Sequence, residues 1–420
     1  MSLCRSAHYD LVIVGAGMVG ASLACILDQS DTRRELKILL VESAPIDLQA
    51  PPAQPSFDAR STVLSHGTVA YLRTLGLWNG LSSKAEGIKT IHVSDQGKFG
   101  AVRLHNEELD VEALGYVIEN RLLGAMFNQV LLNAGNLEIC DAVSVSAITP
   151  LSDGMSVELN KGDEQSSIST TLVVLAEGGR SGLCEKLGIH RSHQSYSQSA
   201  VIANVAFSNS HDNIAYERFT PNGPLALLPL PDLEGEHRAA LVWTRSTKDA
   251  EVIMALSDDD FLEQLQTEFG SRVGNFKRVG QRHSYPLSLD KADEQVRPGL
   301  VLLGNVAHSL HPVAGQGFNL AFRDTMRLAS FLIEAVSNNV SPGSVSVLHD
   351  YLQGTETDQD RTAAFSHYMT RLFSTENSLA VWARKFGLFS IDLVLPLRKA
   401  FARRAMGQGD KQVSVKGLSL

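Results

Sequence analysis

Residues 9–42 carry the pattern that most restricts the fold of this chain. A short apolar run at residues 11–14 leads directly into a G-x-G-x-x-G motif, and an apolar stretch over residues 21–27 follows it. The motif consists of Gly15, Ala16, Gly17, Met18, Val19 and Gly20. A second apolar run at residues 38–41 ends at Glu42. This order predicts a β-α-β unit in which the glycines admit a pyrophosphate and Glu42 binds a ribose diol. A strand–turn–helix unit without a ligand is the alternative, and the motif alone does not separate FAD from NAD.

A second strand–loop–helix unit is predicted over residues 299–324. The continuous apolar run at residues 300–303 is typical of a strand in a sheet that is covered on both faces. A helix is expected to begin between Gly315 and Gly317, so that its free N–H groups and positive dipole end face the loop. The two glycines that flank Gln316 let the backbone approach a flat, partly negative ligand. An ordinary structural unit is again the alternative.

Further candidate contacts lie between these two units. Residues 171–176 predict a buried strand that runs into the glycine-rich turn Glu177-Gly178-Gly179. The segment after Ser61 is predicted to be helical as far as Leu75, which places Arg60 at a loop-to-helix junction. Arg60 is a candidate contact for a ring or a phosphate, with a surface arginine as the simpler interpretation, and Arg121 is a second candidate phosphate contact.

The pattern changes from α/β to β between residues 191 and 285. Residues 201–207, 225–230 and 239–244 are predicted strands of an antiparallel sheet, separated by turns that contain proline and glycine. This change indicates a second domain inserted between segments of the first. The predicted segments of the first domain are residues 1–80, 110–190 and 286–365. Those of the inserted domain are residues 81–109 and 191–285, and residues 366–420 are a predicted helical tail.

The composition excludes several classes of protein. A net charge of -9 argues against nucleic-acid binding, which normally needs a basic field. The four cysteines show no C-x-x-C spacing, which predicts a reducing compartment without a disulfide framework or a zinc site. No apolar run reaches the roughly 18 residues that span a bilayer, and no signal peptide is evident. A cytoplasmic protein is therefore expected.

Residues 368–406 combine basic and apolar side chains in an otherwise acidic chain. The cations are Arg371, Arg384, Lys385, Arg398, Lys399, Arg403 and Arg404. This pattern is typical of helices that lie on an anionic membrane, and it predicts peripheral contact with the inner face of the cytoplasmic membrane. A packed helix pair with a solvated basic face explains the pattern equally well.

Taken in order, three motifs resemble those of the class A flavoprotein aromatic hydroxylases, the family of para-hydroxybenzoate hydroxylase. The counterparts are residues 15–20, Glu177-Gly178, and Gly304-Asn305 with His311-Pro312 and residues 315–319. Glu177 and Asn305 each stand where most of the family has Asp. Other segments resemble more closely the ubiquinone-biosynthesis branch, the bacterial 2-polyprenyl-6-methoxyphenol hydroxylases. These segments are residues 57–60, 91–95, 200–205, 217–220 and 223–226.

The resemblance implies an α/β fold. A Rossmann-like FAD-binding domain of the para-hydroxybenzoate hydroxylase (GR2) type would carry an inserted antiparallel β-sheet substrate domain and a helical C-terminal tail. FAD would lie extended, with its adenosine end at residues 15–42 and its ring near residues 312–319. The implied reaction is the hydroxylation of a polyprenylated methoxyphenol through a flavin C4a-hydroperoxide, with O2 and with NAD(P)H as the co-substrate.

The resemblance also implies roles for individual residues. Those expected to contact FAD are Gly15, Gly17, Met18, Val19, Gly20, Glu42, Arg60, Arg121, Glu177, Gly178, Asn305, Gly315, Gln316, Gly317, Phe318 and Asn319. His311 and Pro312 are expected near the flavin ring, and no general base is assigned. Phe219, Pro224 and Trp243 are expected to line the substrate channel, with core packing as the alternative for each. His308 and His311 lack a third ligand at a suitable spacing, so no metal site is predicted.

Other functions remain compatible with the sequence. A hydroxylase for another ring position of the ubiquinone precursor would differ only in regiochemistry, and a prenyl reductase would consume NAD(P)H without O2. A non-catalytic subunit of a quinone-biosynthesis assembly would not take up FAD. A halogenase is disfavoured because Trp78, Trp243 and Trp382 are far apart in the chain. The expected partners are the polyprenyl phenol, O2 and ubiquinone-biosynthesis proteins, without nucleic acid, and the oligomeric state is open.

Overall fold

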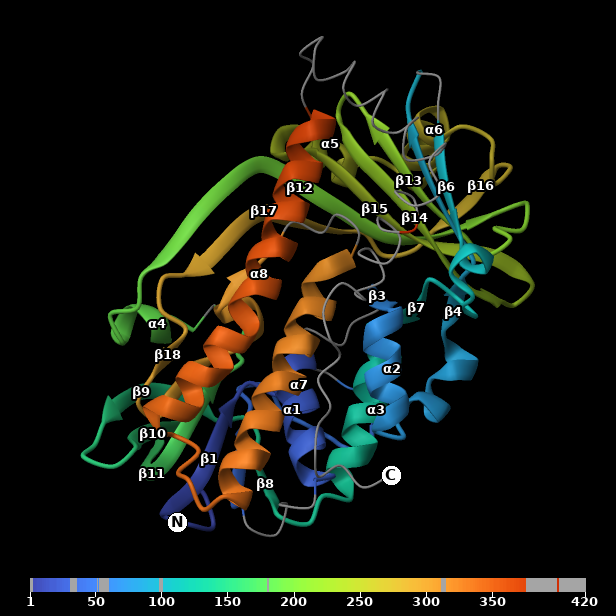
Figure 1. Ribbon diagram of the computed structural model, residues 1–420. Helices are drawn as coiled ribbons and strands as arrows, with labels where there is room; N and C mark the ends of the chain where they lie inside the picture. Colours follow the sequence, from blue (N-terminus) through green and yellow to red (C-terminus); the bar gives the residue numbers. More distant parts are fainter. Residues whose placement is uncertain are drawn as a thin grey trace.

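Two large β-sheets, one above the other in Figure 1, dominate the computed structural model. The structure describes residues 3–30, 36–50, 52, 60–97, 101–179, 181–310, 315–374 and 399. The lower sheet contains both predicted strand–loop–helix units, and the upper sheet contains the predicted β-rich segment. The α/β fold class is therefore confirmed.

The lower sheet has the strand order β18-β19-β11-β1-β2-β8, and β9 and β10 extend it from β11. Its strands are β1 (His8–Val14), β2 (Ile38–Val41), β8 (Leu137–Cys140), β9 (Ser144–Pro150), β10 (Met155–Lys161), β11 (Glu164–Leu175), β18 (Val296–Arg297) and β19 (Leu300–Leu302). The central strand β1 pairs in parallel with both β2 and β11, and β11 pairs in parallel with β19. Val12, Leu39, Val173 and Leu300 are fully buried, as the apolar runs predict.

Helices cover one face of the lower sheet. They are α1 (Met18–Asp28), α2 (His66–Thr74), α3 (Asn120–Leu132) and α7 (Gln316–Ser337). Figure 1 shows α1 between α7 and α3, with α8 (Val345–Ser374) lying along α7. A bidentate ion pair fixes α8 on α7, because Arg323 Nε and Nη2 lie 2.7 and 3.0 Å from the two carboxylate oxygens of Asp358. His308 Nε2 lies 2.8 Å from Asp324 Oδ2 in the same buried region, which makes His308 part of the packing.

A small sheet corrects one sequence prediction. Its strands are β3 (Ser61–Ser65), β7 (Gly115–Glu119) and β4 (Glu86–Ile88), in the order β3-β7-β4. The chain after Ser61 is therefore a strand, whereas a helix was predicted, and α2 begins only at His66. The β-branched residues Thr62 and Val63 pair with β7, and the Ser65 side chain caps α2.

The upper sheet has the strand order β20-β17-β12-β15-β14-β13-β5-β6, and β16 pairs with β12. Its strands are β5 (Thr90–Asp95), β6 (Ala101–His105), β12 (Arg191–Phe207), β13 (Ile214–Thr220), β14 (Gly223–Leu233), β15 (Glu236–Ser246), β16 (Phe276–Val279), β17 (His283–Ala292) and β20 (His308–Ser309). The pairing is antiparallel as predicted, except that β13 and β5 run in parallel. Helices α5 (Thr247–Ala255) and α6 (Asp258–Phe269) pack on one face of this sheet, which leaves the other face toward the lower body.

A β-ribbon joins the two sheets. Residues 191–195 of β12 pair with β17 but not with β15, and β15 joins from Gln198 onward. The register of β12 against β17 shifts between Ser195 and Gln198. At the lower end, Arg191 donates to the carbonyl oxygens of Gly179 and Asn305, each at 3.0 Å. Figure 1 shows β12 and β17 running side by side from the lower sheet to the upper one.

No helix among the described residues is long and apolar enough to cross a membrane. The basic segment at residues 368–406, for which membrane contact is predicted, lies almost entirely outside the described residues.

Candidate active site

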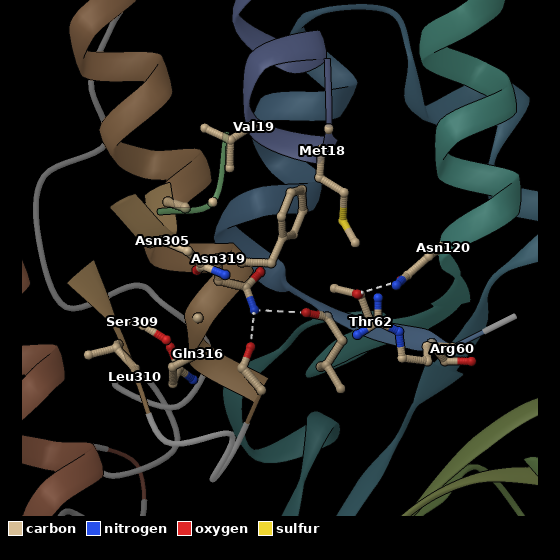
Figure 2. Close-up of a pocket in the computed structure, with 18 of the residues that line it drawn as sticks. Met18, Val19, Arg60, Thr62, Asn120, Asn305, Ser309, Leu310, Gln316 and Asn319 are labelled. Atoms are coloured by element: carbon tan, nitrogen blue, oxygen red, sulfur yellow. Dashed lines mark hydrogen bonds between the residues drawn. The ribbon is translucent and has the colours of Figure 1, made fainter. Parts of the chain in front are cut away.

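A cavity of about 820 Å³ lies between the lower body and the upper sheet. Its walls come from three places: the glycine loop of the first β-α-β unit, the start of α7, and the free face of the upper sheet. Figure 2 shows part of the lining, with Met18 and Val19 at the top, Arg60 at the right, Asn305 and Gln316 at the left, and Asn319 near the centre.

The glycine loop and Glu42 form the polar end of the cavity. Gly15, Gly17, Met18 and Val19 line it. The Glu42 carboxylate accepts hydrogen bonds from the backbone N–H of Ala16 at 2.7 Å and of Ala44 at 2.9 Å. These bonds fix the carboxylate beside the loop, and its remaining lone pairs can accept hydrogen bonds from ribose hydroxyls. Gly20 lies in the first turn of α1, where it packs against Gly15 and does not line the cavity.

The start of α7 forms the second wall, and all five of its predicted residues, residues 315–319, line the cavity. A Cβ atom on Gly317 would meet no atom within 4 Å, so this position is open to a ligand. Asn319 is fully buried. Its Oδ1 accepts from Ser65 N and Thr68 Oγ1, each at 2.8 Å, and its Nδ2 donates to the carbonyl oxygens of Val63 at 2.7 Å and Gly315 at 2.8 Å (Figure 2).

Three helices have their N-terminal ends at this cavity, and none of these ends has a side-chain cap. The N-cap residues of α1, α3 and α7 are Gly17, Glu119 and Gly315, and none of their side chains accepts a hydrogen bond from its helix. By contrast, serine side chains cap α2, α5 and α6. The first N–H groups of an uncapped helix have no partner within the helix, and they carry the positive end of its dipole. The cavity is thus surrounded by donors suited to the phosphates and the electron-rich ring edge of a dinucleotide.

Several other predicted residues also line the cavity. They are Glu177, Gly178, Asn305 and Arg60. The guanidinium of Arg60 lies over the ring of Tyr285, 4.6 Å from its centroid, and this stacking holds the cation at the cavity rim. His311 and Pro312 lie outside the described residues.

Arg121 is not brought to the cavity. Its side chain is 56% exposed and pairs with Glu119, with Nε 2.5 Å from Oε2. The preceding residue, Asn120, is the first residue of α3 and lines the cavity instead. Asn120 Oδ1 accepts a hydrogen bond from Thr62 Oγ1 at 2.6 Å (Figure 2). The sequence pattern favoured the charged Arg121 and not Asn120, because the residue that faces the cavity depends on the exact position at which α3 begins.

The structure places two of the three predicted substrate residues at the cavity. Phe219 and Pro224 line it, whereas Trp243 is fully buried on the opposite face of the sheet. Val242 and Thr244 face the cavity, so the alternation of β15 turns Trp243 away. Its Nε1 donates to Glu268 Oε2 at 3.0 Å, and its ring packs against Phe261. Trp243 is therefore a core residue, and its prediction as a lining residue is corrected.

One titratable residue of the upper wall, Glu217, was not predicted from the sequence. Glu217 on β13 lines the cavity between Ala215 and Phe219. Burial raises the pKa of its carboxyl from 4.5 to about 7. The available signal was a single acid at an inward position of an otherwise apolar strand face, which is informative only once the strand register is known.

Glu217→Gln is expected to stabilise the protein at neutral pH. The raised pKa of Glu217 means that the folded state binds a proton more tightly than the unfolded state does, so wild-type stability falls as the pH rises from 4.5 through 7. The neutral glutamine removes this loss, which amounts to about 3 kcal/mol above pH 7. Urea unfolding of both proteins at several pH values measures the difference. A difference that is equally large at pH 4 and pH 8 would contradict the assignment.

The donor set fits FAD. Uncapped helix starts offer N–H groups, Glu42 offers acceptors for a ribose, and Gly178 and Gly317 leave open space where a side chain would project. The cavity continues from this polar end to the apolar face of the upper sheet, so the same space reaches both a cofactor cradle and a second binding region.

Comparison with known proteins agrees with this fit. The model of the FAD binding domain family matches residues 8–351. Ubiquinone hydroxylase UbiL of Rhodospirillum rubrum is 33% identical over 404 residues, which cover 95% of this chain and 89% of UbiL. The mitochondrial ubiquinone biosynthesis monooxygenase COQ6 of Rattus norvegicus is 30% identical over 445 residues, which cover 94% of this chain and 91% of COQ6.

A solved structure shows the same fold at low sequence identity. The p-nitrophenol 4-monooxygenase PnpA of Pseudomonas putida DLL-E4 superposes with a TM-score of 0.78 at 17% identity, covering 97% of this chain and 100% of PnpA. The family match and the identity to UbiL and COQ6 extend over most of the chain. The chain therefore belongs to the FAD binding domain family, and it is an FAD-dependent aromatic-ring monooxygenase.

Proposed function

We propose that the protein hydroxylates a polyprenylated methoxyphenol in ubiquinone biosynthesis, using FAD, NAD(P)H and O2. The observation that carries this proposal is the shape of the cavity, which joins a polar, glycine-lined cradle to an apolar wall. The names of UbiL and COQ6, a ubiquinone hydroxylase and a ubiquinone biosynthesis monooxygenase, support the substrate class.

The chain's own residues position the reactants. Bound FAD would supply the redox chemistry that transfers an oxygen atom from O2 to the substrate at the expense of NAD(P)H. The backbone N–H groups at the start of α7 stabilise negative charge that develops on the bound ring system. Glu42, held by the glycine loop, would accept hydrogen bonds from a ribose of the cofactor.

The upper sheet supplies a wall suited to a prenyl phenol. In addition to Ala215, Phe219 and Pro224, seven apolar residues of this sheet line the cavity: Ile91, Val93, Leu104, Ile202, Ala226, Leu228 and Val242. They come from strands β5, β6, β12, β14 and β15, so the apolar surface extends across most of the sheet. Such a surface buries an aromatic ring and the beginning of an isoprenoid chain, and it excludes water from the reacting atoms.

Oxygen uptake by the FAD-loaded protein tests the proposal. We expect NADPH-dependent uptake to rise when a short-chain 2-prenyl-6-methoxyphenol is added, and mass spectrometry to show one added oxygen atom in the product. NMR of the product identifies the ring position and thus separates the two hydroxylase alternatives. NADPH oxidation without O2 uptake would instead identify a reductase, and a protein that fails to bind FAD would rule out the enzymatic function.

A further inference from the structure

Glu217 stands in a row of apolar side chains on the cavity wall. Across the upper sheet, Val93, Glu217, Ala226, Val242 and Ile202 are register partners on β5, β13, β14, β15 and β12, in that order. All five side chains line the cavity. Four of them are hydrocarbon, so the carboxyl group of Glu217 is the polar exception in the row.

The neighbours of Glu217 along β13 do not neutralise it. Ala215 and Phe219 share its face and line the cavity. Arg218 lies on the other face, where its Nε donates to the carbonyl oxygen of Glu268 at 2.9 Å. Tyr216 packs its ring edge-on against Phe269, at a centroid distance of 5.4 Å. Arg218, the cation next to Glu217 in the sequence, is thus directed away from the carboxyl group.

Within the described part of the chain, the elements packed around Glu217 also leave it without a charged partner close by. On β5, His92 is the register partner of Tyr216 and contacts its ring, and Asp95 lies at the end of the strand, outside the lining. Next to Ile202 in the sheet, His283 on β17 stacks on Tyr285. The other titratable side chains of the described lining are Glu42, Arg60, Glu177 and Tyr216. Of these, Glu42 and Glu177 belong to the turns of the lower sheet, and Arg60 stacks on Tyr285.

A carboxyl group in an apolar wall is unfavourable unless a ligand satisfies it. The reacting group of a phenol is a hydroxyl donor attached to an apolar ring, and it complements both the carboxylate and the hydrocarbon row beside it. A hydrogen bond to an ionised acceptor is about twice as strong as one between neutral groups. Resting on the function proposed above, we propose that Glu217 binds the phenolic hydroxyl of the substrate and accepts its proton during hydroxylation.

The proton transfer needs no additional reactant. The proton passes from the phenolic oxygen to a carboxylate oxygen of Glu217, and the electron pair of the O–H bond stays on the phenolic oxygen. This charge increases the electron density at the ring carbons ortho and para to the oxygen, one of which forms the new C–O bond. Water then takes the proton from Glu217 after the product leaves. Because burial brings the pKa of Glu217 to about 7, the group can exchange a proton near neutral pH.

Turnover by Glu217→Gln is the first test. Positioned proton acceptors contribute about 10²- to 10⁴-fold to a rate, so we expect at least a hundredfold loss of hydroxylation with an ordinary, un-ionised phenol. The loss should shrink below tenfold with a polyfluorinated phenol that is already ionised in solution. The wild-type rate should also fall below about pH 7 as the carboxylate is protonated, and the variant should lack this decline. An equal loss with both phenols, or no loss, would overturn the proposal.

Glu251→Gln is the matched control. Glu251 is exposed on α5, on the helix-covered side of the upper sheet, so the same chemical change there should leave turnover unchanged. FAD content should remain normal in Glu217→Gln, and its thermal midpoint at neutral pH should not fall below that of the wild type, because the substitution keeps the side-chain volume and removes a buried charge. A loss of FAD that accompanies the loss of turnover would contradict a role directed at the phenol.

A binding measurement made without turnover tests the role of Glu217 independently of the proposed function. In the absence of NAD(P)H, flavin fluorescence titrations compare the affinity of a phenol with that of its methyl ether. Wild type should prefer the phenol by about tenfold or more, and Glu217→Leu, which fills the same space without a polar atom, should lose the preference. If wild type prefers the phenol but produces no hydroxylated product, the proposed function is wrong, whereas the hydrogen bond between Glu217 and the phenolic hydroxyl is supported. If Glu217→Leu keeps the preference for the phenol, or if wild type has no preference, Glu217 does not bind the phenolic hydroxyl.

Discussion

Replacing Asn319 by alanine is expected to lower the free energy of unfolding by about 3–5 kcal/mol and to release FAD from the protein. The Asn319 side chain is fully buried and forms four hydrogen bonds. They connect the start of α7 to β3 and to the first turn of α2, so the amide holds one wall of the cavity against the small sheet. Alanine would leave these partners unsatisfied and open a cavity at the same time. Urea denaturation and the flavin absorbance of the purified protein measure the two effects.

Asn128 provides a matched control for this experiment. It is also buried, on α3, with 2% exposure, but neither its Oδ1 nor its Nδ2 has a hydrogen-bond partner among the described residues. Because Asn128→Ala removes no hydrogen bond, we expect it to cost less than about 1 kcal/mol and to leave FAD bound. Similar losses in the two variants would show that burial, and not the hydrogen-bond network, is what matters at Asn319.

Gly15→Ala is expected to yield protein with little or no bound FAD. Gly15 has φ +102°, which side-chain-bearing residues rarely adopt. An added Cβ would also lie 2.8 Å from Glu177 Cα and 2.9 Å from Ala176 O, so β1 and the end of β11 would have to separate. These two strands carry the glycine loop and the Glu177-Gly178 turn, both of which line the cavity. Flavin absorbance per protein and the thermal midpoint measure the effect.

Gly76→Ala separates backbone strain from the loss of the close contact. Gly76 has φ +67°, but a Cβ there would meet no atom within 4 Å. We expect this variant to lose about 1 kcal/mol of stability and to keep its FAD. If Gly15→Ala behaved like Gly76→Ala, the close packing at the glycine loop would not be needed for cofactor binding.

Sequence reasoning succeeded where the determining interactions are local. The β-α-β unit follows from two apolar runs, three glycines and one acid within about 30 residues, a separation over which strand, turn and helix signals fix one another. The start of α7 follows in the same way from Gly315 and Gly317. The resemblance to the aromatic hydroxylases then supplied the roles of these residues, which local patterns alone cannot assign.

Sequence reasoning failed where distant strands decide which way a side chain points. Trp243 looked like a channel residue, but the register of β15 gives that face to Val242 and Thr244. Glu217 belongs to no motif, and its importance depends on neighbours from four other strands. Cysteine spacing likewise gave no sign that Cys4 and Cys140 meet, with their sulfur atoms 3.2 Å apart. Pairings of this kind arise only from the tertiary structure.

The ribbon of β12 and β17 is a backbone connection between the lower sheet, which carries the cofactor cradle, and the upper wall of the cavity. Two hydrogen-bonded strands resist stretching strongly, but they bend and twist with less resistance, and the register shift between Ser195 and Gln198 is the point where the ladder is interrupted. Arg191 clamps the lower end of the ribbon to the Gly179 turn and to Asn305 at the cofactor end. Together with the ion pair between Arg238 on the upper sheet and Glu119, the stiffness of this ribbon contributes to the spacing of the two walls, although its side chains need not touch either reactant.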